Sequence, residues 1–150
     1  MEFNKALSKC MQMCSRKEYC VFDIKQKLYN WELYESDAEE IIKVLIGEKF
    51  VDEERFVKAF VNDKFKFNHW GKVKIKYHLK HKHIEGIFVD NTLNEIDFDE
   101  YMKVIVHEIS NKIKKVKANS TYERNAKVVN YMAGKGFEPD LVFKQLKKLK

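Results

Sequence analysis

The feature that most constrains the fold of this chain is a short pattern that recurs three times. Each copy places a large apolar residue five positions before another, in the pairs Leu28/Leu33, Leu79/Ile84 and Met132/Phe137. Another residue that is apolar in every copy stands four positions before each pair: Ile24, Ile75 and Val128. The copies are 51 and then 53 residues apart. A spacing of i, i+4 is helical, and a repeat of this length indicates an array of small helical units.

The middle copy also has the look of a strand. In WGKVKIKYHLKHKHI, residues 70–84, apolar and basic residues alternate, which favours a β-strand. The other two copies do not alternate, and one proline with five glycines is too few for the tight turns of an all-β protein. We therefore predict a helix over residues 70–82. Gly136, just before the last residue of the third copy, stands where a helix end favours the left-handed conformation.

The predicted fold is all-α, with three tandem three-helix repeats forming an elongated, curved array. The repeats are residues 1–50, 51–97 and 98–150 of a single helical-repeat chain. Their helices are expected at residues 4–15, 17–30 and 36–49, then 53–67, 70–82 and 87–96, then 98–117, 121–134 and 139–149.

Several residues have the chemistry of helix starts. Ser36 and Glu39 fit a capping box, and Asp52 and either Asp97 or Asp99 suit N-caps. Pro139 suits the first turn of the last helix.

Aromatic residues in the second repeat have two interpretations. Phe56, Phe60 and Phe67 lie on one stripe of a helix, and we expect Phe56 and Phe60 in the core. Trp70 and Tyr77 are interleaved with lysines and could stack on nucleic-acid bases, but packing against the protein is the simpler expectation.

Charge is distributed unevenly along the chain. Residues 1–63 carry a net charge of −3 and residues 64–150 a net charge of +9. Seven lysines and no acidic residue lie between residues 64 and 84. A basic part of this kind indicates an anionic partner, either nucleic acid or an acidic protein surface, although a solvated lysine face would give the same pattern.

The sequence offers little for catalysis or metal binding. His78, His81 and His83 lie close in sequence, but His83 would point away from His78 on a helix. No acidic residue or cysteine in this stretch could complete the ligand set of a metal ion. Cys10 and Cys14 lie on one helical face, and we expect them and Cys20 to be reduced, buried thiols. No nucleophile, zinc or phosphate-loop motif is present. We expect no enzyme activity, no cofactor and no metal.

Three segments resemble the RecX family of bacterial recombination regulators. SRKEYCVFDIKQKL, residues 15–28, looks like the family's first-unit pattern, and FVDEERFVKAFV, residues 50–61, is similar to its apolar-Asp-x-x-Arg-Phe-x-x-x-Phe/Tyr signature. Residues 70–84 look like its Gly-x-x-x-Ile-x-x-x-Leu-x-x-x-Gly-Ile segment, with His83 in place of the usual glycine before Ile84. The resemblance covers nearly the whole chain and implies tandem three-helix repeats.

The resemblance also implies a function: binding the RecA–single-stranded-DNA filament and negatively modulating its assembly, ATP hydrolysis and strand exchange, without enzyme activity. Contact with DNA is left open, and a stand-alone basic nucleic-acid-binding module is the alternative. The structural motif comprises Asp52, Arg55, Phe56, Phe60, Leu79 and Ile84, with Arg55 tying a helix start to a neighbouring unit. The residues expected at the partner or DNA are Arg16, Lys17, Lys72, Lys74, Lys76, Lys80, Lys82 and Arg124.

Remaining expectations concern the cellular setting. No apolar run approaches the roughly 20 residues of a membrane span, and the N-terminal residues lack the apolar core of a signal peptide. We expect a cytoplasmic protein, without membrane attachment and monomeric.

Overall fold

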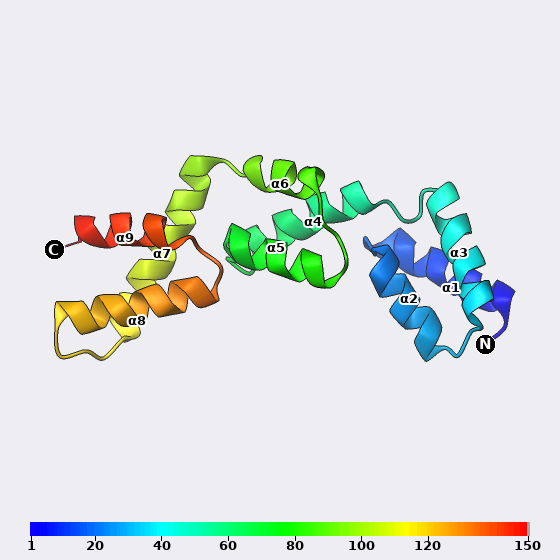
Figure 1. The fold of residues 1–150 in the computed structure, drawn as a ribbon, viewed down its shortest axis with the longest axis horizontal. Helices are drawn as coiled ribbons and strands as arrows, with labels where there is room; N and C mark the ends of the chain where they lie inside the picture. Colours follow the sequence, from blue (N-terminus) through cyan, green and yellow to red (C-terminus); the bar gives the residue numbers. More distant parts are fainter. Residues whose placement is uncertain (150) are drawn as a thin grey trace. The chain divides into compact units, whose positions relative to one another are not determined.

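The computed structural model describes residues 1–149, and every regular element in that range is an α-helix (Figure 1). The helices are α1 (Phe3–Arg16), α2 (Val21–Asn30), α3 (Glu35–Gly47), α4 (Glu53–Lys66), α5 (Lys72–His81), α6 (Ile87–Asn94), α7 (Phe98–Lys115), α8 (Thr121–Gly134) and α9 (Pro139–Lys148). The all-helical prediction is confirmed, including a helix in the strand-like middle copy. None of the helices described combines the length and hydropathy that crossing a membrane requires.

The start of the second helix was predicted wrongly. It begins at Val21 rather than at residue 17, because Lys17 and Cys20 have extended backbones with φ of −158° and −95°. Glu18 lies in this extended segment and receives a hydrogen bond from the Arg55 side chain. Sequence periodicity assigned this segment to a helix, but it is extended, and it contacts Arg55 far along the chain.

Helix capping follows the predictions at some ends and departs from them at others. The Asp52 carboxylate accepts a hydrogen bond from the Arg55 backbone N–H at 3.0 Å, and that of Asp97 accepts one from Glu100 at 3.0 Å. The capping box at Ser36 is wrong, since Tyr34 is the N-cap of α3 and Ser36 lies within its first turn. The same Ser-x-x-Glu pattern does cap α8, where the Ser120 hydroxyl accepts from the Glu123 N–H.

The recurring pattern corresponds to a recurring helix end. Ile24, Ile75 and Val128 are fully buried, and the apolar pairs that follow are buried or half-buried. The residue before the last apolar position has positive φ in every copy: Glu32 at 60°, His83 at 60° and Gly136 at 91°. His83 thus adopts the left-handed turn despite having a side chain, which is a conformation that histidine tolerates better than most residues.

The described chain divides into two compact units, which we treat separately. The first unit comprises residues 1–60 and 81–84. Within it α3 packs against α1 and α2 (Figure 1). Its core is built from small and aliphatic side chains: Ala6, Cys10, Ile24, Leu28, Ile41, Ile42, Leu45 and Val51. Cys10 and Cys20 are buried, as predicted, whereas Cys14 is half-buried, and all three are free thiols.

The second unit comprises residues 61–80 and 85–150, of which 150 lies outside the described range. Within it α8 packs against α7 and α9, and α7 also contacts α9 (Figure 1). Its largest fully buried side chains include Tyr101 and Phe137, whose ring centroids lie 5.6 Å apart. The division of the chain at residues 50 and 97 into three repeats stays a prediction.

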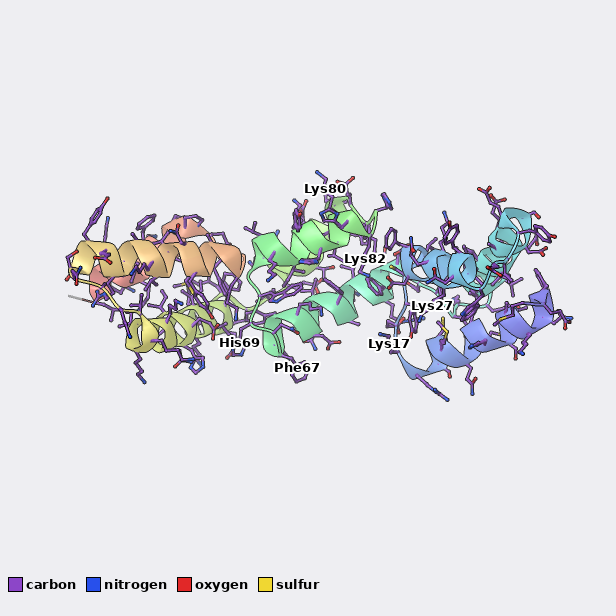
Figure 2. All side chains as sticks on the ribbon, turned by 90° about the horizontal axis from the view of Figure 1, so that it is seen from below. Lys17, Lys27, Phe67, His69, Lys80 and Lys82 are labelled. Atoms are coloured by element: carbon purple, nitrogen blue, oxygen red, sulfur yellow. The ribbon has the colours of Figure 1, made fainter. Side chains whose placement is uncertain are left out.

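Two aromatic residues are more exposed than the sequence pattern indicated. Phe67 is 80% exposed and projects from the end of α4 (Figure 2), because α4 ends at Lys66 and its buried positions are Phe56, Val57, Val61 and Phe65. Tyr77, which was expected to pack against the protein, is 58% exposed. Phe56 is buried and Phe60 is half-buried, with stacked rings 5.6 Å apart.

Candidate interaction surface

Helix α5 brings together four of the residues predicted to contact a partner. Lys72, Lys76 and Lys80 recur at i, i+4 and i+8 and therefore follow one another along the helix, with Lys74 on another side. The opposite side of α5 is anchored by the fully buried Ile75 and Leu79. The helix thus presents lysines outward because Ile75 and Leu79 are held in the core.

The lysines of α5 differ in what they contact. Lys76 Nζ lies 2.7 Å from the Asp90 carboxylate, and Lys80 Nζ lies 3.8 Å from that of Glu85. Both pairs are exposed, so solvent and salt weaken them and the ammonium groups can exchange to another anion at little cost. Lys72 Nζ lies 4.9 Å from the centre of the Tyr101 ring, and the Lys72 backbone N–H donates to the Tyr101 hydroxyl at 3.0 Å.

Trp70, just ahead of α5, lies within a group of basic side chains. The ammonium groups of Lys74 and Lys64 lie 4.5 Å and 5.0 Å from its ring centre, and the His78 ring is 4.5 Å away. Cations near an indole face gain from its quadrupole. The expectation that Trp70 packs against protein groups agrees with these contacts, and the contacts also gather positive charge on this side of α5.

The other predicted contact residues lie elsewhere. Lys82 belongs to the first unit, where its Nζ lies 2.6 Å from Asp23 and its side chain is 27% exposed, an arrangement that favours a structural role. Arg16 is exposed at the end of α1, and Lys17 Nζ lies 4.9 Å from the Tyr19 ring centre. Arg124 belongs to the second unit, where it hydrogen-bonds the Asn125 side chain and lines an open surface hollow between α7 and α8.

Arg55, at the start of α4, makes contacts that favour the structural interpretation of the Asp52-x-x-Arg55 motif. Its Nε donates to Glu18 Oε2 at 2.7 Å, and one terminal nitrogen donates to the carbonyls of Lys49 and Phe50 at 3.0 and 3.2 Å. The hydrogen bond to Glu18 raises the pKa of the Arg55 guanidinium, which therefore remains charged. Arg55 therefore connects the chain before α4 with the extended segment before α2.

The histidines singled out by the sequence do not converge. His78 contacts Trp70, and the His83 ring lies 5.4 Å from that of Phe22 in the first unit. Among the described residues, none of His78, His81 and His83 belongs to a cluster that could hold a metal ion. The cluster that does exist is His69, His107 and Glu108. Sequence reasoning missed it because 38 residues separate the first two.

A buried ion pair in the second unit also had no clear sequence signal. Glu108 on α7 is 7% exposed, and its Oε1 lies 2.6 Å from Lys135 Nζ, while its Oε2 lies 3.2 Å from His69 Nδ1. Burial opposes the ionised form, but hydrogen bonds from Lys135 and His69 outweigh this effect and lower the pKa of the Glu108 carboxyl. The one hint of this ion pair in the sequence was that an acidic residue, Glu108, lies on the apolar stripe of α7.

Models of two domains of one family match the chain. "RecX, second three-helix domain" matches residues 52–93, and "RecX, third three-helix domain" matches residues 99–146. Together these matches span more than half of the chain. They include the α4 motif, the lysines of α5 and the whole of α8.

Curated relatives and solved structures agree with these models. "Regulatory protein RecX" of Leuconostoc mesenteroides is 26% identical over 91% of the chain, and that of Clostridioides difficile 25% identical over 97%. The chain spans 51% and 68% of the lengths of these two relatives.

A crystal structure of regulatory protein RecX superposes with a TM-score of 0.86 at 21% identity, covering 97% of this chain and 73% of that one. The crystal structure of RecX from Lactobacillus salivarius gives a TM-score of 0.82 at 18% identity, covering 98% and 96%. These structures bear out the fold, and the curated relatives bear the name of a regulator rather than an enzyme. The chain belongs to the RecX family of regulatory proteins.

Proposed function

We propose that this protein is a cytoplasmic regulator that binds the RecA–single-stranded-DNA filament and restrains filament assembly, ATP hydrolysis and strand exchange. Family membership supports a regulatory role, and the RecX resemblance supplies RecA as the expected partner. The observation in the molecule that best supports an anionic partner is the row of lysines on α5, which is anchored by Ile75 and Leu79.

The proposed contact uses the exposed ammonium groups of α5. Lys76 and Lys80 are 59% and 72% exposed and form surface ion pairs with Asp90 and Glu85. Surface pairs contribute only about 0–1 kcal/mol each, so an acidic partner can replace them. Contacts repeated along one chain add through effective concentration, which lets individually weak pairs support binding to a repetitive filament.

The direct test is the rate of DNA-dependent ATP hydrolysis by RecA from the same organism, measured with and without this protein. Inhibition at substoichiometric amounts, at concentrations too low to coat the DNA, is the expected result. Unchanged hydrolysis at stoichiometric excess would overturn the proposal.

A pair of charge-reversal variants tests the surface. Lys76→Glu/Lys80→Glu should inhibit less than the unaltered protein. Lys43→Glu/Lys103→Glu is the matched control, because its lysines are 75% and 74% exposed and each is in one surface ion pair, with Glu40 and Glu100. Both variants have the same net charge. Equal inhibition by the two variants would remove α5 from the contact surface, while circular dichroism checks that both remain helical.

A second candidate function is DNA binding without RecA. The observation that favours it is Trp70 with Lys64, Lys74 and His78 around it, since an aromatic face within a basic patch suits single-stranded nucleic acid. This function predicts tight, steeply salt-dependent binding to single-stranded DNA alone. Inhibition of RecA under conditions where DNA binding by the free protein is undetectable would exclude it as the cause.

A further inference from the structure

The groups His69, His107 and Glu108 form a compact cluster in the second unit. His69 follows the end of α4, and His107 and Glu108 are consecutive residues of α7. One donor atom from each residue lies within 4.8 Å of those of the other two. His69 is labelled in Figure 2, where it lies between the end of α4 and α7. The cluster brings together donors from two helical segments that are far apart in sequence.

The spacing of two of these donors already suits a metal ion. Ligands about 2.0–2.1 Å from a tetrahedral zinc lie about 3.3 Å from one another. The His69 Nδ1 and Glu108 Oε2 atoms are 3.2 Å apart. His107 is exposed, and its ring stands perpendicular to that of His69 with the centroids 5.8 Å apart. The donor atom of His107 lies within 4.8 Å of the other two, and its exposed side chain has room to turn toward the same ion.

The surroundings hold these side chains in the way that ligands of a metal are usually held. Lys135 donates to Glu108 Oε1 at 2.6 Å and leaves Oε2 facing His69. The side-chain amide of Asn111 lies 3.1 Å from His107 Nε2 and orients that ring. Such outer contacts fix ligand orientation in established metal sites.

The donor set also selects the class of ion. Two imidazole nitrogens and one carboxylate oxygen suit Zn²⁺ and its neighbours Co²⁺ and Ni²⁺, whereas Mg²⁺ and Ca²⁺ prefer oxygen ligands alone. The ammonium of Lys135 already neutralises Glu108 and repels a second cation, so it lowers affinity without blocking Oε2.

We propose that His69, His107 and Glu108 bind one divalent transition-metal ion of the zinc class, with water at the remaining position. Binding would connect the end of α4 to α7 within the second unit and stabilise that unit. The inference does not depend on the RecA proposal, since it rests on the donor geometry alone.

The test is a titration of the reduced 150-residue protein with Co²⁺, followed by visible absorption, and with Zn²⁺ as competitor. One Co²⁺ per chain with a strong low-coordination spectrum, displaced by Zn²⁺, is expected. His107→Ala should weaken binding by at least about a hundredfold, because loss of an outer contact alone costs 10–100-fold. His107 is exposed, so this variant should fold.

Two further variants distinguish the site from other donors. His81→Ala removes an exposed histidine outside the cluster and should bind Co²⁺ like the unaltered protein. Lys135→Gln keeps a hydrogen-bond donor for Glu108 but removes the repelling charge, so it should bind Co²⁺ more tightly. No binding at millimolar Co²⁺, binding by His107→Ala equal to that of the unaltered protein, or a cobalt–thiolate spectrum from the cysteines would each overturn the proposal.

Discussion

Arg55 shows how one side chain can hold several segments of the first unit together. It contacts the Glu18 carboxylate and the carbonyls of Lys49 and Phe50. Glu18 Oε1 is buried without a hydrogen-bond partner, and Arg55 hydrogen-bonds the other oxygen of this carboxylate, whose side chain is 27% exposed. Removing one member of such a pair costs more than the pair itself contributes, because the remaining charge is left desolvated.

Arg55→Ala should therefore destabilise the protein. The Arg55 side chain is 44% exposed, which reduces the expected loss to about 1–2 kcal/mol in the free energy of unfolding. Urea denaturation is the measurement. Arg16→Ala, which removes an exposed arginine at the end of α1, is the control and should change stability by less than about 0.5 kcal/mol. Equal effects of the two substitutions would contradict the structural role of Arg55.

The buried cysteines predict a loss of stability in alkaline solution. Burial raises the pKa of the Cys10 thiol to about 11 and that of Cys20 to about 12, from an ordinary value of 9.0. Thiols in the unfolded chain lose their protons at lower pH than the buried thiols of the folded protein. The contribution of these thiols to stability is therefore intact below pH 9.0 and is lost as the pH rises toward the folded pKa values. Each thiol contributes about 1.4 kcal/mol of destabilisation per pH unit in this window.

Thermal unfolding between about pH 8 and 11 checks this prediction, in a range set by the ordinary thiol pKa. The melting temperature should fall above pH 9.0, and Cys20→Ala should make the fall less steep. Cys20→Ala also leaves a small cavity, so the comparison is the slope with pH rather than the absolute melting temperature. An identical slope in the variant would count against ionisation of Cys20 as a cause.

At the scale of the helices, two glycines set how closely α5 approaches the end of α8. The Gly71 N–H donates to the Lys135 carbonyl at 2.7 Å, and the Val73 N–H donates to the Gly136 carbonyl at 3.0 Å. A Cβ on Gly71 would lie 2.3 Å from the Gly136 carbonyl carbon and oxygen. Both neighbours are backbone atoms, so the clash cannot be relieved by turning a side chain.

Gly71→Ala should therefore destabilise the second unit by about 3 kcal/mol, because overpacking forces the α5 and α8 backbones apart. Gly134→Ala is the matched control: its added Cβ meets nothing within 4 Å, and its φ is not positive. That variant should be more stable by about 0.4–1 kcal/mol, because alanine lowers the entropy of the unfolded chain. Urea denaturation of both variants measures the difference. Similar stabilities would show that the helices separate easily at Gly71.

Charge is the property that belongs to the whole molecule. The chain carries +6, with the excess in residues 64–150. Exposed charges are screened over about 10 Å at 0.1 M salt and about 3 Å at 1 M. If the basic residues of α5 contact an acidic filament surface, inhibition of RecA should weaken as salt increases.

The measurement is the concentration of protein needed for half-inhibition of RecA ATP hydrolysis across a series of salt concentrations, each with its own RecA-only reference. The unaltered protein should show a steep rise, and Lys76→Glu/Lys80→Glu a shallower one. Lys43→Glu/Lys103→Glu should follow the unaltered protein. Salt independence in the unaltered protein would indicate that apolar contacts rather than lysines dominate binding.

Most of the local architecture was accessible from the sequence. The i, i+4 spacing of Ile24/Leu28, Ile75/Leu79 and Val128/Met132 identified the helices, including α5, whose alternating residues look like a strand. This was possible because helical periodicity depends on neighbours within one or two turns. The failures, the capping box at Ser36 and the helix start at residue 17, came at helix ends, whose exact positions are decided by packing.

The contacts that build the sites were decided only by the tertiary structure. Arg55 and Glu18 are 37 residues apart, and His69 and Glu108 are 39 apart. Gly71 meets Gly136, which lies 65 residues further along the chain. No periodicity relates such residues, because their proximity results from how separate helices bury their apolar sides. The sequence alone determined helices, family resemblance and charge, whereas the packing of helices determined which of its polar residues meet.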